Sequence, residues 1–403
     1  MIRNLCVSLI QSEQKRRSTL VTLLFILLCA VLAVWFILSI DMWRGLSKLS
    51  SIEDFSYKNQ GPLLSIIVPA RNEEEAITES IVSQLQQDYD QIQWILVNDR
   101  STDGTRGKMD TLAKMDKRIT VLQIDSLEKG WLGKNNALYK GYQKSEGELI
   151  LFTDADVIFK DSTALSRAVS VLQSQGLDHL TLAPYIQSQS FWLKSFVSYF
   201  LFGFSFYKRP WKANEPSSKI GMGIGAFNLI TRSAYEEIGT HEKIKHMPDD
   251  DLQLGIHIKK HGKRQNLLTA LQSLEVEWYR SLKEAFNGLE KNTFAGLHYS
   301  ILLVLFAMIG VFCSTVLPFM TLFSGVFPIQ IVSLMILFFI GISYVKVMKT
   351  MTNESPLLFF VLPVTALLFI YSIGRATFLT YKRGGIEWRG TVYSLKELKQ
   401  KRK

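Results

Sequence analysis

Cysteine is scarce in this sequence of 403 residues, which contains only Cys6, Cys29 and Cys313. Two of them lie inside apolar runs and the first lies just ahead of one, and no pair has the spacing of metal ligands. We therefore expect neither a disulfide scaffold nor a zinc site. The lack of cysteine in the charged middle of the chain agrees with a reducing, cytoplasmic location for that region.

Acidic residues are outnumbered, with 36 Asp and Glu against 46 Lys and Arg, which gives a formal net charge of +10. Such an excess suits nucleic acid or anionic lipid as a partner. The basic residues do not form a stripe with interleaved aromatics, as single-strand binders do. They gather beside apolar segments, at Lys15-Arg16-Arg17 and between Lys396 and Lys403. This placement predicts lipid headgroups, and no nucleic acid, as the partner of the excess charge.

Four apolar runs are long enough to suggest a membrane protein. The run 19–40 carries no charge and has the length needed to cross a bilayer. A cleaved signal peptide is the competing interpretation, but the run is too long and lacks a clear cleavage site, which favours an anchor. Three more runs follow at 301–323, 328–345 and 356–380, the last with Arg375 near its end, where it can reach the interface. We expect a multi-pass protein of the cell membrane with a basic N-terminal segment (1–18), an anchor (19–40), a membrane region of about three hydrophobic helices (297–380) and a basic tail (381–403).

The region between the anchor and the later runs, residues 56–296, has the pattern of a soluble α/β domain. Short, nearly continuous apolar segments alternate with helical stretches at 73–86 and 135–144. Strands that are apolar throughout indicate a mostly parallel sheet with helices on both faces. Ligands of such sheets bind at the carboxyl ends of the strands. The expected strands are 63–69, 93–97, 119–124 and 148–152.

Polar clusters follow three of these strands, at 68–73, 97–101 and 151–156. A single Asp at such a place can simply cap a helix or stabilise a turn, and for Asp103 that interpretation is as good as a functional one. Three clusters at one edge of one sheet are harder to explain structurally. They predict a binding site at that edge.

The pair Asp154 and Asp156 is the sharpest of these signals. Two carboxylates one residue apart at a strand end can both approach one hard cation. Mg²⁺ or Mn²⁺ typically takes one or two protein carboxylates and completes its shell with substrate phosphates. An Asp-x-Asp is common by chance, but its place directly after an apolar strand favours a metal site with a phosphate ligand.

Three adjacent carboxylates, Asp249, Asp250 and Asp251, repel one another and need cations or open solvent nearby. They could form a solvated loop in which one Asp caps the expected helix 252–261. They could instead supply a general base for an acceptor hydroxyl, held in orientation by the start of that helix.

Glycines are dense between Gly221 and Phe227, just before a short apolar stretch. This turn does not open the first strand–helix unit, so it is not a dinucleotide fingerprint. Close approach of the backbone to a ligand is the more plausible use of these glycines. The segment 191–207 is crowded with aromatic residues, and either ordinary core or a helix in the bilayer interface explains it.

These motifs, in this order, resemble the inverting family 2 glycosyltransferases, whose nucleotide-diphospho-sugar transferase fold is of the GT-A, SpsA-like type. The resemblance covers roughly residues 62–295. The matching stretches are 65–73, 97–105, 133–138, 153–156, 225–227 and 250–255.

The resemblance implies a role for each matching residue. Asp251, paired with Asp250 where the family has Glu, would be the catalytic base, with Asp249 leaving an ambiguity of one position. Asp156 would be the main ligand of Mg²⁺ or Mn²⁺, with Asp154 toward the metal and the sugar or ribose. The remaining residues would bind the nucleotide sugar, expected to be a UDP-sugar (Pro69, Arg71, Glu73, Asp99, Lys134 and Asp154), or the acceptor (Gly225, Ala226 and Phe227).

One departure from the family pattern narrows the expected activity. Processive members carry Gln-x-x-Arg-Trp after the base, and this chain instead has 277–282, in which Arg280 could contact the diphosphate. The pattern resembles the lipid-modifying members, such as the carotenoid-acid, hopanoid-associated and ceramide glucosyltransferase-like enzymes, and 386–390 resembles the same group. We therefore expect metal-assisted, inverting transfer of a single sugar to a hydroxyl or carboxyl group of a membrane lipid. The alternatives are a processive polysaccharide synthase and a non-catalytic sugar-nucleotide-binding membrane scaffold.

The expected membrane topology contains a conflict. Nucleotide sugars are cytoplasmic, which places the catalytic region there, and Lys346 and Lys349 agree under the positive-inside rule. With four crossings, however, Lys15-Arg16-Arg17 and the basic tail would both face outward. A re-entrant or interfacial course for one apolar run would relieve this conflict.

Overall fold

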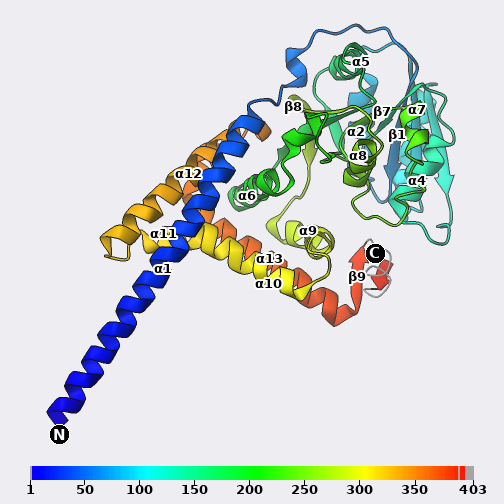
Figure 1. Cartoon of the computed structure of the whole chain (residues 1–403). Coiled ribbons are helices and arrows are strands. Elements are labelled where there is room, and N and C mark those ends of the chain that lie inside the picture. Colours follow the sequence, from blue (N-terminus) through cyan, green and yellow to red (C-terminus); the bar gives the residue numbers. More distant parts are fainter. Residues whose placement is uncertain (1, 389–390, 395–403) are drawn as a thin grey trace.

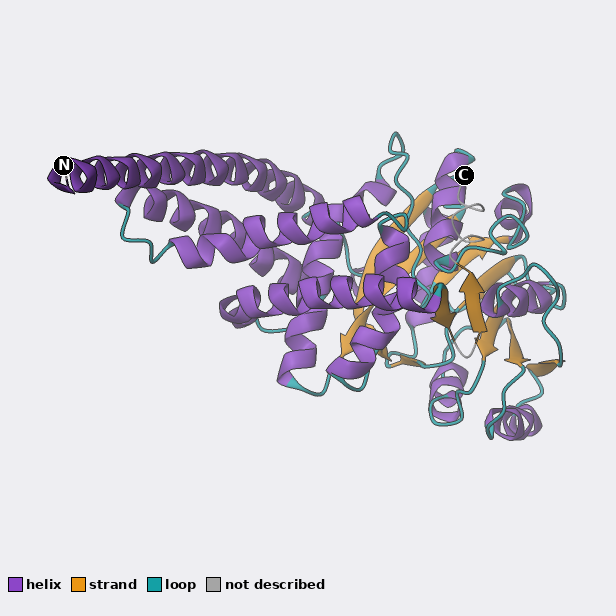
Figure 2. Ribbon diagram, turned by 90° about the horizontal axis from the view of Figure 1, so that it is seen from below, coloured by secondary structure: helices purple, strands orange, loops and turns teal. Residues whose placement is uncertain are grey.

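The computed structural model describes residues 2–388 and 391–394 and shows an α/β domain joined to a group of long helices (Figure 1). Helix α1 (Ile2–Leu46) leads into the α/β domain, and the other long helices follow the domain in sequence. Figure 2 shows the strands gathered at one end of the molecule and the long helices at the other.

Eight strands form one sheet in the order β3-β2-β1-β4-β7-β6-β8-β5. The strands β1 to β4 are parallel, β7 runs antiparallel between β4 and β6, β6 and β8 are again parallel, and β5 is antiparallel at the edge. The expected mostly parallel sheet is confirmed. Its strands are β1 (Leu64–Ala70), β2 (Ile92–Asp99), β3 (Ile119–Ile124), β4 (Leu149–Phe152), β5 (Val157–Phe159), β6 (His179–Gln187), β7 (Asn228–Thr231) and β8 (Gln265–Glu277).

Helices cover both faces of the sheet because successive strand residues point in opposite directions. On one face, Ile66 and Val68 pack with α2 (Ile77–Leu85), α3 (Thr105–Met115) and α5 (Ala164–Ser174). The other face, which includes Ile67, packs against the helices α4 (Gly133–Tyr142), α7 (Arg232–Glu237) and α8 (Asp250–Lys260). Both faces are thus buried, as expected from strands without polar alternation.

Helix α2 starts at Ile77, four residues later than the sequence pattern predicts. The reason is that the loop between β1 and α2 is hydrogen-bonded to the loop after β2. Asn72 has a φ of 56°, and its side-chain oxygen accepts a hydrogen bond from the Thr102 amide at 2.8 Å. The Glu73 amide donates to the Thr105 hydroxyl at 2.8 Å. Asp103 accepts from the Glu74 amide and the Thr105 hydroxyl, so its position fits the structural role.

Helix α1 is packed into the rest of the molecule rather than hanging from it. Asp41 accepts two hydrogen bonds from the Arg209 guanidinium, each 2.7 Å long. Gly45 lies so close to the indole of Trp211 that an added Cβ would come within 2.2 Å of it. The buried side chains of α1 include Leu28, Trp35, Met42 and Leu46.

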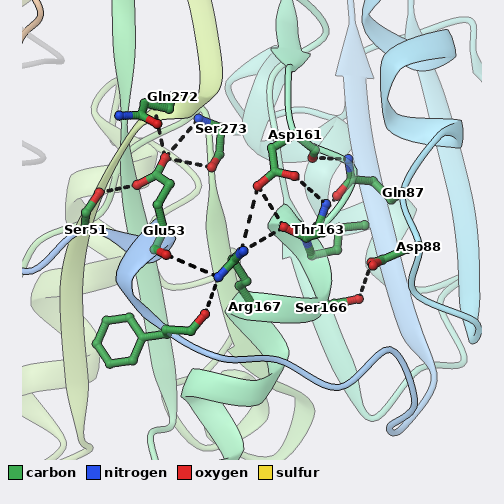
Figure 3. Close-up of polar contacts among 12 residues, drawn as sticks. Ser51, Glu53, Gln87, Asp88, Asp161, Thr163, Ser166, Arg167, Gln272 and Ser273 are labelled. Carbon is green, nitrogen blue, oxygen red and sulfur yellow. Dashed lines mark hydrogen bonds and ion pairs between the residues drawn. The ribbon is translucent and has the colours of Figure 1, made fainter.

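The segment after α1 is fastened to the sheet through Glu53, in the short helix η1 (Ile52–Asp54) (Figure 3). One carboxylate oxygen of Glu53 accepts from the amides of Gln272 and Ser273, at 3.1 and 3.0 Å. The other oxygen accepts from the Ser51 hydroxyl. Burial raises the pKa of Glu53, but these hydrogen bonds outweigh it and lower the pKa overall. Arg167 of α5 donates to the Glu53 carbonyl at 3.2 Å, which ties the same segment to a second element.

Four described helices are long and apolar enough to cross a membrane: Glu13–Leu46, Ile301–Thr321, Phe327–Met351 and Pro356–Arg383. Each predicted apolar run lies largely within one of them. The later ones are built from α10 (Ile301–Val311), a π-helical turn η3 (Phe312–Val316), α11 (Leu317–Thr321), α12 (Phe327–Met351), η4 (Pro356–Val361) and α13 (Leu362–Arg383), followed by the hairpin of β9 (Gly385–Trp388) and β10 (Thr391–Ser394).

The aromatic segment forms α6 (Phe191–Lys208), which lies between the sheet and the long helices. One side of it is buried, and there the ring of Phe196 packs edge-to-face against the ring of Phe286 in α9 (Leu282–Gly296). Phe191, Trp192 and Tyr207 are exposed. The helix therefore combines core packing on one side with exposed aromatic rings on the other.

Candidate active site

A cavity lies at the carboxyl end of β4, where the sequence motifs predicted a site. Its wall is formed by residues from β4, α4, α8, the glycine turn and the loop after α7. The lining residues are Lys134, Leu138, Phe152, Thr153, Asp154, Gly225, Asn228, His241, Asp250, Asp251 and Leu254. Five of the predicted site residues, Lys134, Asp154, Gly225, Asp250 and Asp251, are thus brought together.

Lys134 holds the acidic side chains of this cavity together. Its ammonium lies 2.6 Å from Asp154 and 3.7 Å from Asp250. Burial alone lowers the pKa of Lys134, but the neighbouring carboxylates, Asp154 first, raise it above its ordinary value. Lys134 is therefore a permanent cation, able to meet the phosphates of a donor as well as the carboxylates.

Asp251 is oriented by two backbone donors. Its Oδ2 accepts from the amide of Gly225 at 2.8 Å, and its Oδ1 accepts from the amide of Leu252 at 2.8 Å. Burial raises the pKa of Asp251 above its ordinary value, and the opposing effects of Lys134 and the two backbone amides do not outweigh it. Asp249 is not among the residues that line the cavity, and it accepts instead from the side chain of Gln253 at 2.9 Å. The candidates for a base are therefore Asp250 and Asp251.

The glycine turn is shaped by close approach to helix α8. A Cβ on Gly221 would lie 2.1 Å from the carbonyl of Gly255, and one on Gly223 would lie 1.9 Å from the carbonyl of Asp251. We expected these glycines to admit a ligand, and at these two positions they admit the helix backbone. Gly225 differs, because its Cβ position faces the cavity, 2.4 Å from Asp154 Oδ2 and 3.3 Å from Lys134 Nζ.

We predict that Gly225→Ala lowers the rate of the sugar transfer expected from the family resemblance by one to two orders of magnitude, without unfolding the protein. The added methyl would push Asp154 from its pairing with Lys134, and misplacements of about 1 Å can cost about 10²-fold in rate. Initial rates and thermal unfolding in detergent would be measured together. Gly107→Ala in α3, where an added Cβ meets nothing within 4 Å, is the matched control. Equal rates for both variants would show that the space beside Gly225 is not used.

Asp156 lies beside Asp154 and close to Glu73, and this crowding of carboxylates bears on metal binding. Burial and the charges of Asp154 and Glu73 raise the pKa of Asp156 to about 7. A divalent cation would relieve the same repulsion, so the donor set fits one. Among the described residues, no group of three His, Cys, Asp or Glu side chains has the arrangement of a metal site. Asp154 and Asp156 would therefore hold a cation jointly with phosphate and water oxygens, as Mg²⁺ and Mn²⁺ do elsewhere.

The other four residues predicted to bind the nucleotide sugar, Pro69, Arg71, Glu73 and Asp99, do not line this cavity and lie at or just after the ends of β1 and β2. Asp99 is buried and paired with Arg100, whose Nε lies 2.7 Å from Asp99 Oδ1. Gly133, beside Lys134, allows this pair to approach α4, because a Cβ there would come within 2.5 Å of Asp99. Pro69 belongs to β1, next to Val97 of β2, and Arg71 follows that strand. The strand order places them beside Asp154 along one sheet edge.

Two residues that were predicted to bind the acceptor lie away from the cavity. Ala226 and Phe227 do not line the cavity, and Phe227 is fully buried in the core, 6.1 Å from the ring of Phe159. The Ala226 carbonyl accepts from the Thr153 hydroxyl at 2.7 Å, which fixes the turn to β4. Arg280 is exposed and paired with Glu75 and Glu277, at the surface rather than in the cavity.

His241 is a cavity residue that the sequence patterns did not reveal. Its Nδ1 lies 2.6 Å from the hydroxyl of Tyr235, and that hydroxyl also accepts from the His241 amide at 3.1 Å. Burial, helped by the charge of Lys134, lowers the pKa of His241 to about 3, so the ring stays neutral.

Comparison with known proteins assigns this domain. Residues 65–239 match the model of glycosyl transferase family 2. This part of the chain is a family 2 glycosyltransferase domain, as predicted from the motifs.

Among similar proteins, an uncharacterized glycosyltransferase of Haemophilus influenzae is 38% identical over 120 residues, 30% of this chain and 35% of that protein. The 4,4'-diaponeurosporenoate glycosyltransferase of Staphylococcus aureus (strain USA300) is 34% identical over 130 residues, 32% of this chain and 33% of that protein. The matched segments thus span about a third of these curated relatives.

A solved structure extends the likeness beyond the matched domain. The mannosyltransferase PcManGT from Pyrobaculum calidifontis, solved in complex with GDP-Man and Mn²⁺, aligns with a TM-score of 0.51 over 89% of this chain and 98% of that one, at 15% identity. At this identity the likeness concerns the fold, and the predicted GT-A fold is confirmed.

Proposed function

We propose that this protein transfers a single sugar from a nucleotide-diphospho-sugar to a hydroxyl or carboxyl group of a membrane lipid. The observation that carries the proposal is the cavity in which Lys134, Asp154 and Asp251 converge on Gly225. A cation for a diphosphate, a carboxylate for a metal and an oriented base are the groups that such a transfer needs.

Asp251 acts as the base in this proposal. It accepts the proton of the acceptor oxygen as that oxygen attacks the anomeric carbon from the face opposite the leaving group. The new carbon–oxygen bond forms while the bond to the diphosphate breaks, and the electron pair leaves with the nucleoside diphosphate. The amide of Gly225 keeps Asp251 oriented, and Lys134 stabilises the charge on the departing phosphate.

Asp154 and Asp156 are the residues that would hold Mg²⁺ or Mn²⁺. When bound, such a cation supplies Lewis acidity toward the diphosphate oxygens. The complex of the structural neighbour PcManGT with Mn²⁺ supports this assignment by analogy of fold.

A lipid acceptor is supported by three features. The domain is continuous with four helices suited to a membrane, and α6 exposes Phe191, Trp192 and Tyr207 beside them. The relative from Staphylococcus aureus is named a 4,4'-diaponeurosporenoate glycosyltransferase, which gives that carboxylate as the substrate of that protein. The donor is proposed to be a UDP-sugar on the family resemblance, and GDP-Man, the ligand named for PcManGT, is the alternative to test.

The test is incubation of the purified full-length protein with labelled UDP- and GDP-sugars, total membrane lipid and Mg²⁺ or Mn²⁺. We expect one donor to give a lipid product heavier by a single sugar residue, with one nucleoside diphosphate released per product, by mass spectrometry. Products carrying long sugar chains would show a processive synthase. Donor binding without nucleoside diphosphate release would show a non-catalytic protein. Either result would overturn the proposal.

A further inference from the structure

Asn228 is a polar side chain of the cavity wall to which the proposed transfer gives no role. It begins β7, between β4 and β6, where it pairs with Phe152 on one side and Thr181 on the other. Only 2% of its surface is exposed. A primary amide at this depth needs partners for its oxygen and for its two N–H groups.

A chain of side chains fixes which way the Asn228 amide faces. The chain starts at Gln265 of β8, whose Oε1 accepts from the Met222 amide at 2.8 Å. The Nε2 of Gln265 donates to the Gly255 carbonyl at 3.3 Å and to His179 Nδ1 at 2.8 Å. Because an amide nitrogen can only donate, Nδ1 of His179 is the acceptor and carries no proton.

His179 orients Asn228 in turn. Burial lowers the pKa of His179 to about 4, so the ring is neutral and its one proton lies on Nε2. Nε2 lies 3.1 Å from Asn228 Oδ1, to which it donates. The Ile224 amide donates to the same oxygen at 3.3 Å. These two donors fix the oxygen of the Asn228 amide, so its nitrogen faces the opposite way.

The nitrogen of the Asn228 amide faces the cavity. Within the part of the chain that the structure describes, no group accepts a hydrogen bond from Nδ2, yet Nδ2 is not one of the enclosed atoms that lack a partner. Because Asn228 lines the cavity and is otherwise buried, the accessible surface of Nδ2 lies in the cavity. A donor that the protein orients but does not pair calls for a partner from outside.

The space beside Asn228 is small. It measures about 10 Å³, which is room for one water-sized group but not for a sugar ring. The apolar side chains of Leu138, Phe152 and Leu254 line it together with Asp154 and Asp251. In the proposed transfer the sugar lies between the metal carboxylate and the base, so a ring hydroxyl is the group that reaches this space.

We propose that Asn228 donates a hydrogen bond to one hydroxyl group of the donor's sugar, and that this hydroxyl occupies the cavity. Asn228 then determines which sugars are accepted, because a bulkier substituent at that position, such as an acetamido group, exceeds the space. Gln265 and His179 act only through Asn228, as positioning residues. Since the ligand is a nucleotide sugar only if the proposed function holds, this role of Asn228 rests on that function.

The test compares UDP-glucose with its 2-, 3-, 4- and 6-deoxy analogues, and GDP-mannose with the same set, by calorimetric titration of the purified protein with Mn²⁺. In wild type we expect at least one analogue to bind about tenfold more weakly than its parent, because the loss of its hydroxyl leaves a buried donor unpaired. In Asn228→Ala the parent should bind about tenfold more weakly, and one such analogue should lose nothing further. The hydroxyl and the amide then contribute one shared hydrogen bond.

Two further variants sharpen the comparison. Asn266→Ala in β8 is the matched control, because Asn266 bonds Gln175 at 2.7 Å and does not line the cavity. It should keep the affinities of wild type for every probe. His179→Phe tests the positioning role and should weaken binding of the parent more than binding of the same analogue. A purely structural role of His179 would weaken both equally.

Equal affinity of wild type for the parent sugars and all their deoxy analogues would overturn the role of Asn228, even if no variant folded. Differences between parent and analogues that persist unchanged in Asn228→Ala would overturn it as well. In both cases, binding of the parent by wild type would leave the proposed transfer standing. Failure of wild type to bind any nucleotide sugar would instead count against the proposed function, and against this role with it.

Discussion

Asp251→Asn should lower the rate of sugar transfer by about 10²–10⁴-fold, the usual contribution of a general base. Asparagine keeps the size and the acceptor oxygen that bonds the Gly225 amide at 2.8 Å, so the turn should stay in place. The variant loses the ability to take a proton and, because one carboxylate oxygen becomes an amide nitrogen, the hydrogen bond from the Leu252 amide. Its dissociation constant for the donor should change less than about threefold, which calorimetry with the intact nucleotide sugar would measure.

The matched control is Asp249→Asn, two residues earlier, which removes the same charge from a residue not found in the cavity wall. We expect it to keep most of the activity. A similar loss of donor binding and of turnover in Asp251→Asn would contradict its role as a base. A larger loss in Asp250→Asn than in Asp251→Asn would move the role to Asp250, whose carboxylate lies 3.7 Å from Lys134.

Asp156→Asn should lower transfer by about 10²–10³-fold, because metal stabilisation of the leaving group contributes several kcal/mol and each 1.36 kcal/mol is a factor of ten in rate. Unlike Asp251→Asn, it should also weaken donor binding in the presence of Mn²⁺. A chelator should give wild type the same two defects, and added Mn²⁺ or Mg²⁺ should reverse them in wild type. Asp110→Asn, an exposed residue of α3, controls for the lost charge.

A pH series sharpens this second prediction. Because the pKa of Asp156 is raised to about 7, the carboxyl is protonated below that pH, and a metal must displace the proton. The affinity for Mn²⁺ in wild type should therefore rise between pH 6 and pH 8, as measured by Mn²⁺-dependent binding of the donor. Full activity in excess chelator, or no effect of Asp156→Asn on Mn²⁺ dependence, would contradict a metal at this position.

The sheet and much of the cavity could be predicted because each rests on a local pattern. Continuous apolar strands such as 119–124 coincide with a strand of the structure, and the edge position of Asp154 follows from the strand that precedes it. The family match of residues 65–239 confirms the class of domain. Sequence reasoning thus succeeded where neighbours in sequence are also neighbours in space.

The rest depends on contacts between distant segments. His241 is a lone histidine, and only the fold brings it to Lys134 and buries it against Tyr235. Phe227 follows the glycine turn, but its side chain is buried in the core near Phe159. The apolar composition of α13 does not reveal its partners, and only the fold shows that Phe369 lies against Tyr199 of α6 and that Arg375 donates to Asn287 of α9.

The joint between α1 and the domain, made by Asp41 with Arg209 and by Gly45 against Trp211, has a consequence for how an acceptor is chosen. A flexible stalk would let the cavity sample many heights above the bilayer. This rigid joint instead keeps the cavity at one height. For a lipid acceptor, encounter then becomes a two-dimensional search within the leaflet. Selection would rest on how far the reactive oxygen stands from the lipid surface as well as on the shape of the headgroup.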